Sequence, residues 1–352
     1  MALKPAAVAP TSSELEIEAA RLADKGLAGL GYRDEELERA ARLTWRINRL
    51  KKEQRAVIPA HVYQRPEILL GVADLVGDSY RLAKLCADAD AKSIIFCGVR
   101  FMAETAKILS PDKEVLLPAP EAGCSLSESI SAADVRALKK KHPGAPVAVY
   151  INTTAAVKAE CDVVVTSANA PKILRKLFAE HEQVIFAPDA MMGKNLAKEL
   201  GKKLGEELII WEGTCIVHDN FDATSVEFYR KMYPGVKILA HFECTPALTS
   251  VVDYIGGTGD MMKWVADHKS SSYMLITECG LGDLARTKFP DKVFVPMCRL
   301  CPHMKSVTLE RVLSALESPS AAQRIDVPAA VAARALRPIQ RMFELSEDKA
   351  SS

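Results

Sequence analysis

The chain has 352 residues, enough to bury a large core and to form two or three domains. Its hydrophobic fraction of 49% and charged fraction of 26% are ordinary for a globular protein, and its formal net charge of +1 gives no overall attraction to nucleic acid or to an anionic membrane. No apolar run approaches the roughly 18 residues that cross a bilayer, and polar residues and prolines interrupt the N-terminus where a signal peptide needs an apolar stretch. We therefore expect a cytoplasmic protein with no nucleic-acid or membrane partner.

Residues 1–55 are expected to form a helical extension. Two helical patterns run from Ser13 to about Leu50. The second begins at Asp34 with acidic residues and ends in Lys51 and Lys52, the arrangement that a helix dipole favours.

Short apolar runs then alternate with helical stretches three times. Continuous Val, Ile and Leu runs of this kind are typical of strands in parallel sheets that are buried on both faces. The expected strands are 56–59, 73–76, 93–96 and 114–117, then 147–151, 162–165, 183–186 and 207–210, then 237–241, 253–255, 273–276 and 292–295. The sequence therefore predicts an α/β protein with three related units, at residues 56–135, 136–225 and 226–316, and a C-terminal helical segment at residues 317–352.

One cysteine follows the last strand of each unit. Cys124, Cys215 and Cys301 are separated by 91 and 86 residues, and a helix start follows each of them. A single cysteine in such a place is more often a small buried residue, but the repeat favours three ligands that face one centre. Three thiolates could hold zinc or an iron–sulfur cluster. Structural zinc normally takes four ligands, whereas a [4Fe–4S] cluster on three cysteines leaves one iron open as a Lewis acid.

The other six cysteines are expected to have other roles; they are Cys86, Cys97, Cys161, Cys244, Cys279 and Cys298. The first three lie in apolar segments and are interpreted as structural. Cys244 and Cys279 follow glutamates and are expected to line a cavity without binding metal. Cys298 has two open interpretations: it replaces Cys301 as a ligand, or it pairs with Cys301 reversibly.

The carboxyl ends of the strands carry polar side chains that recur from unit to unit. Ligands of open α/β sheets bind beyond these ends, where helix N-termini present free N–H groups. Each first strand is followed by two side chains at positions i and i+2 that exchange protons or form hydrogen bonds, namely His61 with Tyr63, Tyr150 with Asn152, and His241 with Glu243. Each second strand is followed by a hydroxyl suited to a carboxylate or phosphate, namely Ser79, Ser167 and Thr258.

Two further features near these positions are less specific. His218, three residues after Cys215, either supports that thiol or caps a helix. The glycines at 256, 257 and 259 do not complete a dinucleotide fingerprint, because Met262 stands where the last glycine is needed.

The motifs at these strand ends closely resemble those of the quinolinate synthases, the [4Fe–4S] enzymes of NAD biosynthesis. The resemblance covers roughly residues 60–316. Its specific parts are His61–Gln64, Gly77–Ser79, Gly123–Cys124, Tyr150–Thr154, Thr166–Asn169, Pro188–Asp189, Cys215–His218, His241–Cys244, Thr258, Thr277–Glu278 and Cys301–Met304.

The resemblance implies three pseudo-symmetric, three-layer α/β/α domains with short parallel sheets around a central active site. It also implies that iminoaspartate condenses with dihydroxyacetone phosphate, losing phosphate and two waters, to give quinolinate. The implied ligands of the cluster are Cys124, Cys215 and Cys301. The residues that would orient intermediates and move protons are His61, Tyr63, Tyr150, Asn152, His241 and Glu243, and those that would hold carboxylate or phosphate oxygens are Ser79, Ser167 and Thr258.

Within this set, we expect Glu243 to be a principal base and Tyr63 or Tyr150 an acid. The chain departs from the family pattern at Gly257, where serine is usual, and in the third cysteine motif, where only Cys298 and Cys301 remain. A transient contact with an aspartate oxidase or dehydrogenase, as the source of the imine, is one option among the partners. The alternatives are a non-catalytic iron–sulfur sensor and a zinc-dependent lyase or hydrolase that uses the same three thiols.

Overall fold

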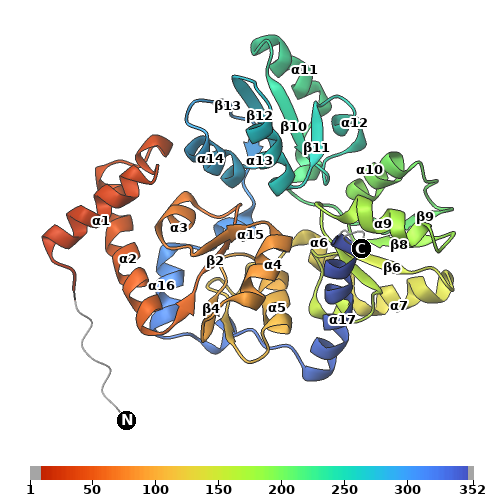
Figure 1. Ribbon diagram of the computed structural model, residues 1–352, viewed down its shortest axis with the longest axis horizontal. Helices are drawn as coiled ribbons and strands as arrows, with labels where there is room; N and C mark the ends of the chain where they lie inside the picture. Colours follow the sequence, from red (N-terminus) through yellow and green to blue (C-terminus); the bar gives the residue numbers. More distant parts are fainter. Residues whose placement is uncertain (1–8, 348–352) are drawn as a thin grey trace, which may run out of the picture.

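Four short parallel sheets organise the computed structural model, which describes residues 9–347 (Figure 1). Residues 1–8 and 348–352, the outer ends of the two expected helical segments, lie outside the described residues. All ten pairs of neighbouring strands are parallel, as the buried apolar runs predict. The predicted α/β class is therefore confirmed.

Two of these sheets belong to the first unit. Its strands are β1 (Ala56–Val57), β2 (Pro59–His61), β3 (Leu75–Gly77), β4 (Ser93–Ile95) and β5 (Glu114–Leu116). The expected first strand is divided, because the N–H of Ile58 donates to Asp74 at 2.9 Å instead of to a neighbouring strand. A bridge between Ala60 and Cys97 joins the two sheets, so the strands run in the order β3, β1 with β2, β4, β5.

The second and third units repeat this order. The second sheet is β7 (Val163–Val165), β6 (Val147–Tyr150), β8 (Val184–Ala187) and β9 (Leu208–Ile210). The third is β11 (Tyr254–Gly256), β10 (Lys237–His241), β12 (Ser272–Glu278) and β13 (Val293–Val295), with the short strand β14 (Cys298–Arg299) paired to the end of β12. In every unit the first strand therefore lies between the second and the third.

One aspartate marks the same corner of each unit. Asp74, Asp162 and Asp253 stand just before the second strand and accept an N–H near the start of the first strand, from Ile58, Val147 and Ile238, at 2.9, 2.8 and 3.0 Å. Each carboxylate also forms an ion pair: Asp74 with Lys51, Asp162 with Lys139, and Asp253 with both Arg230 and Lys237. This recurring contact supports the interpretation of the units as structural repeats, while the exact boundaries given above stay a prediction.

Helices cover the sheets of each unit. In the first they are α3 (Pro66–Gly71), α4 (Ser79–Asp88), α5 (Arg100–Leu109) and α6 (Ser125–Glu128); in the second α7 (Ala132–Lys141), α8 (Ala155–Lys158), α9 (Ala170–Phe178) and α10 (Ala190–Leu200); in the third α11 (Ala223–Met232), α12 (Pro246–Thr249), α13 (Thr258–Asp267), α14 (Cys279–Lys288) and α15 (Pro302–Lys305). One buried apolar cluster runs through the first two units, whereas two further clusters centre on the third unit and include Val62 of the first unit and Val217 and Phe221 of the second.

The first and last elements of the described residues are helices. Helix α1 (Ser12–Asp24) packs against α2 (Asp34–Glu53), and α2 lies beside α16 (Leu309–Glu317) (Figure 1). Arg39 of α2 forms an ion pair of 2.5 Å with Glu310 of α16. Helix α17 (Ala329–Ser346) lies along the second unit, where Lys176 donates to the carbonyl of Leu345 at 2.8 Å. Within residues 9–347, none of the helices has the length and apolar character needed to span a membrane.

Candidate active site

The twelve side chains expected at the strand ends line one cavity. They are Cys124, Cys215, Cys301, His61, Tyr63, Tyr150, Asn152, His241, Glu243, Ser79, Ser167 and Thr258. All three units contribute, because each sheet directs the carboxyl ends of its strands toward the same space.

The starts of helices α4, α9 and α13 meet at this cavity. A Cβ atom on Gly257 would lie 2.6 Å from Oγ of Ser167, and one on Gly259 would lie 2.8 Å from Oδ2 of Asp78, so a larger residue at either place would displace these side chains. Among the described residues that line the cavity there is no lysine or arginine. Anionic groups would therefore be bound by hydroxyls and by free N–H groups at helix starts.

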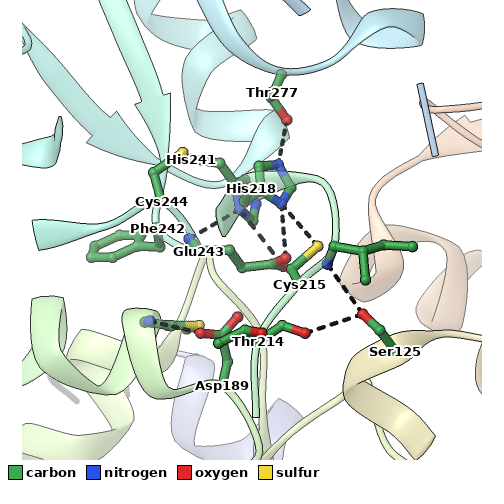
Figure 2. Close-up of polar contacts among 12 residues, drawn as sticks. Ser125, Asp189, Thr214, Cys215, His218, His241, Phe242, Glu243, Cys244 and Thr277 are labelled. Atoms are coloured by element: carbon green, nitrogen blue, oxygen red, sulfur yellow. Dashed lines mark hydrogen bonds and ion pairs between the residues drawn. The ribbon is translucent and has the colours of Figure 1, made fainter. Parts of the chain in front are cut away.

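A continuous chain of hydrogen bonds links two tyrosines of the cavity. The hydroxyl of Tyr150 donates to Oε1 of Glu243 at 2.6 Å, and Oε2 of Glu243 lies 2.9 Å from Nδ1 of His218. Nε2 of His218 is 2.9 Å from Oγ1 of Thr277, which is 2.6 Å from the hydroxyl of Tyr63. Figure 2 shows His218 between Glu243 and Thr277. This arrangement can carry protons from one side of the cavity to the other.

The carboxylate and the tyrosines of this chain have opposite charge preferences. Burial opposes ionisation of Glu243, but the facing His218 and His241 and the hydrogen bonds from His218 and Tyr150 outweigh it and hold its pKa well below the usual range. Burial and the nearby charge of Glu243 raise the pKa of both Tyr63 and Tyr150 well above 10. Glu243 is therefore an ionised acceptor, and the tyrosines are protonated donors.

His61 and His241 occupy equivalent places in the first and third units. Nδ1 of each ring accepts the backbone N–H two residues later, from Tyr63 at 3.2 Å and from Glu243 at 3.3 Å. Burial lowers the pKa of both rings to about 3. Each histidine is therefore neutral near pH 7 and carries its proton on Nε2, where it can donate to a ligand.

The three expected ligand thiols are free and partly exposed to the cavity. Burial raises the pKa of Cys124 to about 12 and also raises the pKa values of Cys215 and Cys301. With Glu243 beside them and no protein cation among the described cavity residues, three thiolates need a bound cation for stability. The donor set therefore fits a metal ion or a cationic iron–sulfur core.

Cys298 forms a disulfide with Cys279, which was not among its expected partners. The pairing of β14 with β12 brings the two residues together, with 4.9 Å between their Cα atoms. Neither of the two interpretations of Cys298 matches this arrangement, and Cys301 keeps a free thiol. Cys244 and Cys279 were expected to line the cavity, and neither of them does. Cys244 is buried in the sheet with Sγ 3.8 Å from the carbonyl of Ile276, and Cys279 is held in the disulfide.

Several supporting residues were missed or only partly recognised in the sequence. His218 was left between two roles, and Thr277 was noted only as part of a motif. Ser125 joins two cysteine loops: its hydroxyl donates to the carbonyl of Thr214 at 3.1 Å and accepts the N–H of Ile216 at 3.2 Å (Figure 2). Lys158, fully buried, donates to the carbonyls on both sides of Asn152. The contacts of His218 with Thr277 and of Ser125 with Thr214 join segments 59 and 89 residues apart, so no local pattern in the sequence signals them.

Comparison with known proteins identifies the family. Residues 45–344 match the family model of quinolinate synthetase A protein. The quinolinate synthase of Sinorhizobium fredii is 43% identical over 301 residues, which cover 86% of this chain and 82% of the relative. Quinolinate synthase 1 of Mesorhizobium japonicum is 45% identical over 297 residues, covering 84% of this chain and 89% of the relative, and the Xylella fastidiosa quinolinate synthase is 44% identical over 299 residues, covering 85% and 86%. The chain therefore belongs to the quinolinate synthase family, enzymes of NAD biosynthesis that use an iron–sulfur cluster.

Proposed function

We propose that this chain condenses iminoaspartate with dihydroxyacetone phosphate to form quinolinate, with loss of phosphate and two waters. Cys124, Cys215 and Cys301 would hold the [4Fe–4S] cluster, one ligand from each unit. When bound in this way, the cluster supplies an open iron that acts as a Lewis acid for dehydration. The observation that carries the proposal is that three free thiols and the proton-carrying chain line the same cavity.

The substrates would be held by neutral donors. Ser79, Ser167 and Thr258 would bind carboxylate or phosphate oxygens together with the helix N–H groups beside them. His61 and His241 would donate from Nε2, and Asn152 from its amide. Because the histidines are neutral, the site would bind its anionic substrates through hydrogen bonds and the metal centre. Binding would not require a positive charge on either histidine.

Glu243 would be the principal base. Its ionised carboxylate can take a proton from the condensing substrates, while Tyr150 or Tyr63 donates one to an oxygen that leaves. The proton on Glu243 can then pass through His218 and Thr277 to Tyr63, since each neighbouring pair of atoms lies within 2.9 Å. Both tyrosines would thereby regain their protons from Glu243. The contact with an aspartate oxidase or dehydrogenase, as the source of the imine, is part of this proposal.

A zinc-dependent lyase is the second candidate, favoured by one observation. Ligand atoms of Cys215, His218 and Glu243 lie within 4.8 Å of one another, which suits a single ion. A zinc ion there would occupy the base and its histidine neighbour and would leave Cys124 and Cys301 without a role. The cluster proposal uses all three thiols and keeps the base free.

Anaerobic purification followed by an assay of quinolinate formation tests the proposal. We expect a brown wild-type protein that contains iron and sulfide and makes quinolinate from imine and triose phosphate, and a Cys215→Ala variant that has lost both properties. A colourless, active wild type with one zinc per chain would instead support the second candidate.

A further inference from the structure

A buried ion pair lies behind the cavity, where the first unit, the third unit and the loop to Cys301 meet. Nζ of Lys305 is 3.0 Å from Oε1 of Glu278, and the two side chains are 13% and 0% exposed. Neither residue lines the cavity or belongs to the hydrogen-bonded chain of tyrosines. Placing two charges in a protein interior is costly unless further hydrogen bonds satisfy them, so their other partners show what the pair does.

Glu278 holds the backbone of the third thiol. Its Oε1 accepts the N–H of Cys301 at 3.1 Å, and its Oε2 accepts the N–H of Gly280 at the start of α14, at 2.7 Å. The carboxylate therefore fixes the direction in which the Cys301 loop leaves the third sheet.

Lys305 holds the loop that carries Tyr63. Its ammonium group donates to the carbonyl of Tyr63 at 2.6 Å, and its own carbonyl accepts two hydrogen bonds from Arg65, at 3.1 and 2.8 Å. The start of α14 packs directly against the same loop, because a Cβ atom on Gly280 would lie 2.8 Å from the carbonyl oxygen of Val62. One ion pair thus reaches both a thiol loop and a tyrosine loop.

We propose that Glu278 and Lys305 are positioning residues that set Cys301 and Tyr63 at a fixed separation, so that the third cluster ligand and one proton donor are placed by the same charged contact. The inference rests on the proposed function, in which Cys301 is a ligand and Tyr63 a donor. Residues that orient metal ligands in this way typically contribute about 10–100-fold to metal affinity or to activity.

Other contacts tie the same loop to the third unit without the ion pair. These are the Cys279–Cys298 disulfide and the pairing of β14 with β12. Removal of the ion pair is therefore expected to loosen the positions of Cys301 and Tyr63 while the fold persists.

The variants Glu278→Gln and Lys305→Met test the proposal against Lys51→Met as a matched control. Lys51 also joins a carboxylate and a backbone carbonyl, contacting Asp74 and Val72 at 2.7 Å. These contacts lie at the amino ends of the strands, whereas the cavity lies at the carboxyl ends. Four readouts are compared: iron and sulfide after anaerobic reconstitution, the electron paramagnetic resonance signal of the reduced cluster, kcat with KM, and the rate at which iodoacetamide alkylates Cys301 in cluster-free protein.

We expect both site variants to lose about 10–100-fold in kcat, to change the resonance signal and to alkylate Cys301 faster, while the control keeps wild-type values. The proposal is overturned if both site variants match the control in all four readouts. It is also overturned if neither variant folds, because a positioning role leaves the fold intact. If only Lys305→Met fails to fold, the four readouts of Glu278→Gln decide whether the proposal stands. A wild type without cluster or quinolinate formation would refute the proposed function instead.

Discussion

The residues at the amino ends of the strands repeat from unit to unit more closely than the residues at the carboxyl ends. At the amino ends all three units have the same contact, an aspartate that accepts an N–H near the start of the first strand and pairs with a cation. At the carboxyl ends the equivalent pairs diverge into His61 with Tyr63, Tyr150 with Asn152, and His241 with Glu243. The repeat is therefore retained where it stabilises each unit and is varied where the cavity needs different chemistry.

Loss of a carboxylate at a carboxyl end is predicted to affect catalysis most. Glu243→Gln keeps the size of the side chain but removes the base, so we expect kcat to fall by about 10²–10⁴ with an unchanged iron content. Steady-state kinetics and iron analysis measure both. Near-normal turnover in this variant would show that the base has been misassigned.

The neutral histidines at the carboxyl ends predict a pH-dependent stability of the cluster-free protein. The folded pKa of His61 and of His241 is about 3, whereas histidine in an unfolded chain titrates near pH 6.5. Between these values the unfolded chain binds protons that the folded protein does not bind. The free energy of unfolding should therefore fall as the pH drops below about 6.5, by about 1.4 kcal/mol per pH unit for each histidine.

Urea unfolding between about pH 7.5 and 5.5 measures this slope, in a range where most carboxylates stay ionised. Replacing both His61 and His241 with asparagine should flatten it. A wild type whose stability does not vary over this range would contradict the assignment of neutral histidines.

Loss of a carboxylate at an amino end is predicted to affect stability and to spare the chemistry. Asp162→Asn weakens the hydrogen bond from the N–H of Val147, at 2.8 Å, and the ion pair with Lys139, at 3.3 Å. We expect the free energy of unfolding to fall by about 1–3 kcal/mol, measured by urea titration, with kcat of the folded protein unchanged. A large loss of kcat would contradict the assignment of stability to the amino ends of the strands and of catalysis to the carboxyl ends.

The smallest predicted effect comes from a single link in the proton-carrying chain. Thr277→Val removes the hydroxyl between Tyr63 and His218 without changing the shape of the side chain, so we expect kcat to fall about tenfold. Thr277→Ser keeps the hydroxyl and should retain most of the activity. Equal kcat values in the two variants would show that this path carries no proton needed for turnover.

The sequence predicted what local patterns determine. The apolar runs located every described strand except β14, with β1 and β2 expected as one strand, and the recurrence of Cys124, Cys215 and Cys301 indicated a common centre. Strand β14 was missed because two residues carry no periodic signal, and the Cys279–Cys298 disulfide depends on that strand. The contact between His218 and Thr277 joins residues that are 59 positions apart in the chain, so it becomes visible only in the folded protein.

The central claim is that one thiol from each unit holds a single cluster in the cavity where quinolinate forms. Iron and sulfide analysis, together with the rate of quinolinate formation, in wild type, Cys301→Ala and Cys298→Ala tests this claim most directly. We predict about four iron atoms per chain and an active enzyme for the wild type and for Cys298→Ala, and the loss of both properties for Cys301→Ala. Full iron content and activity in Cys301→Ala would contradict the account.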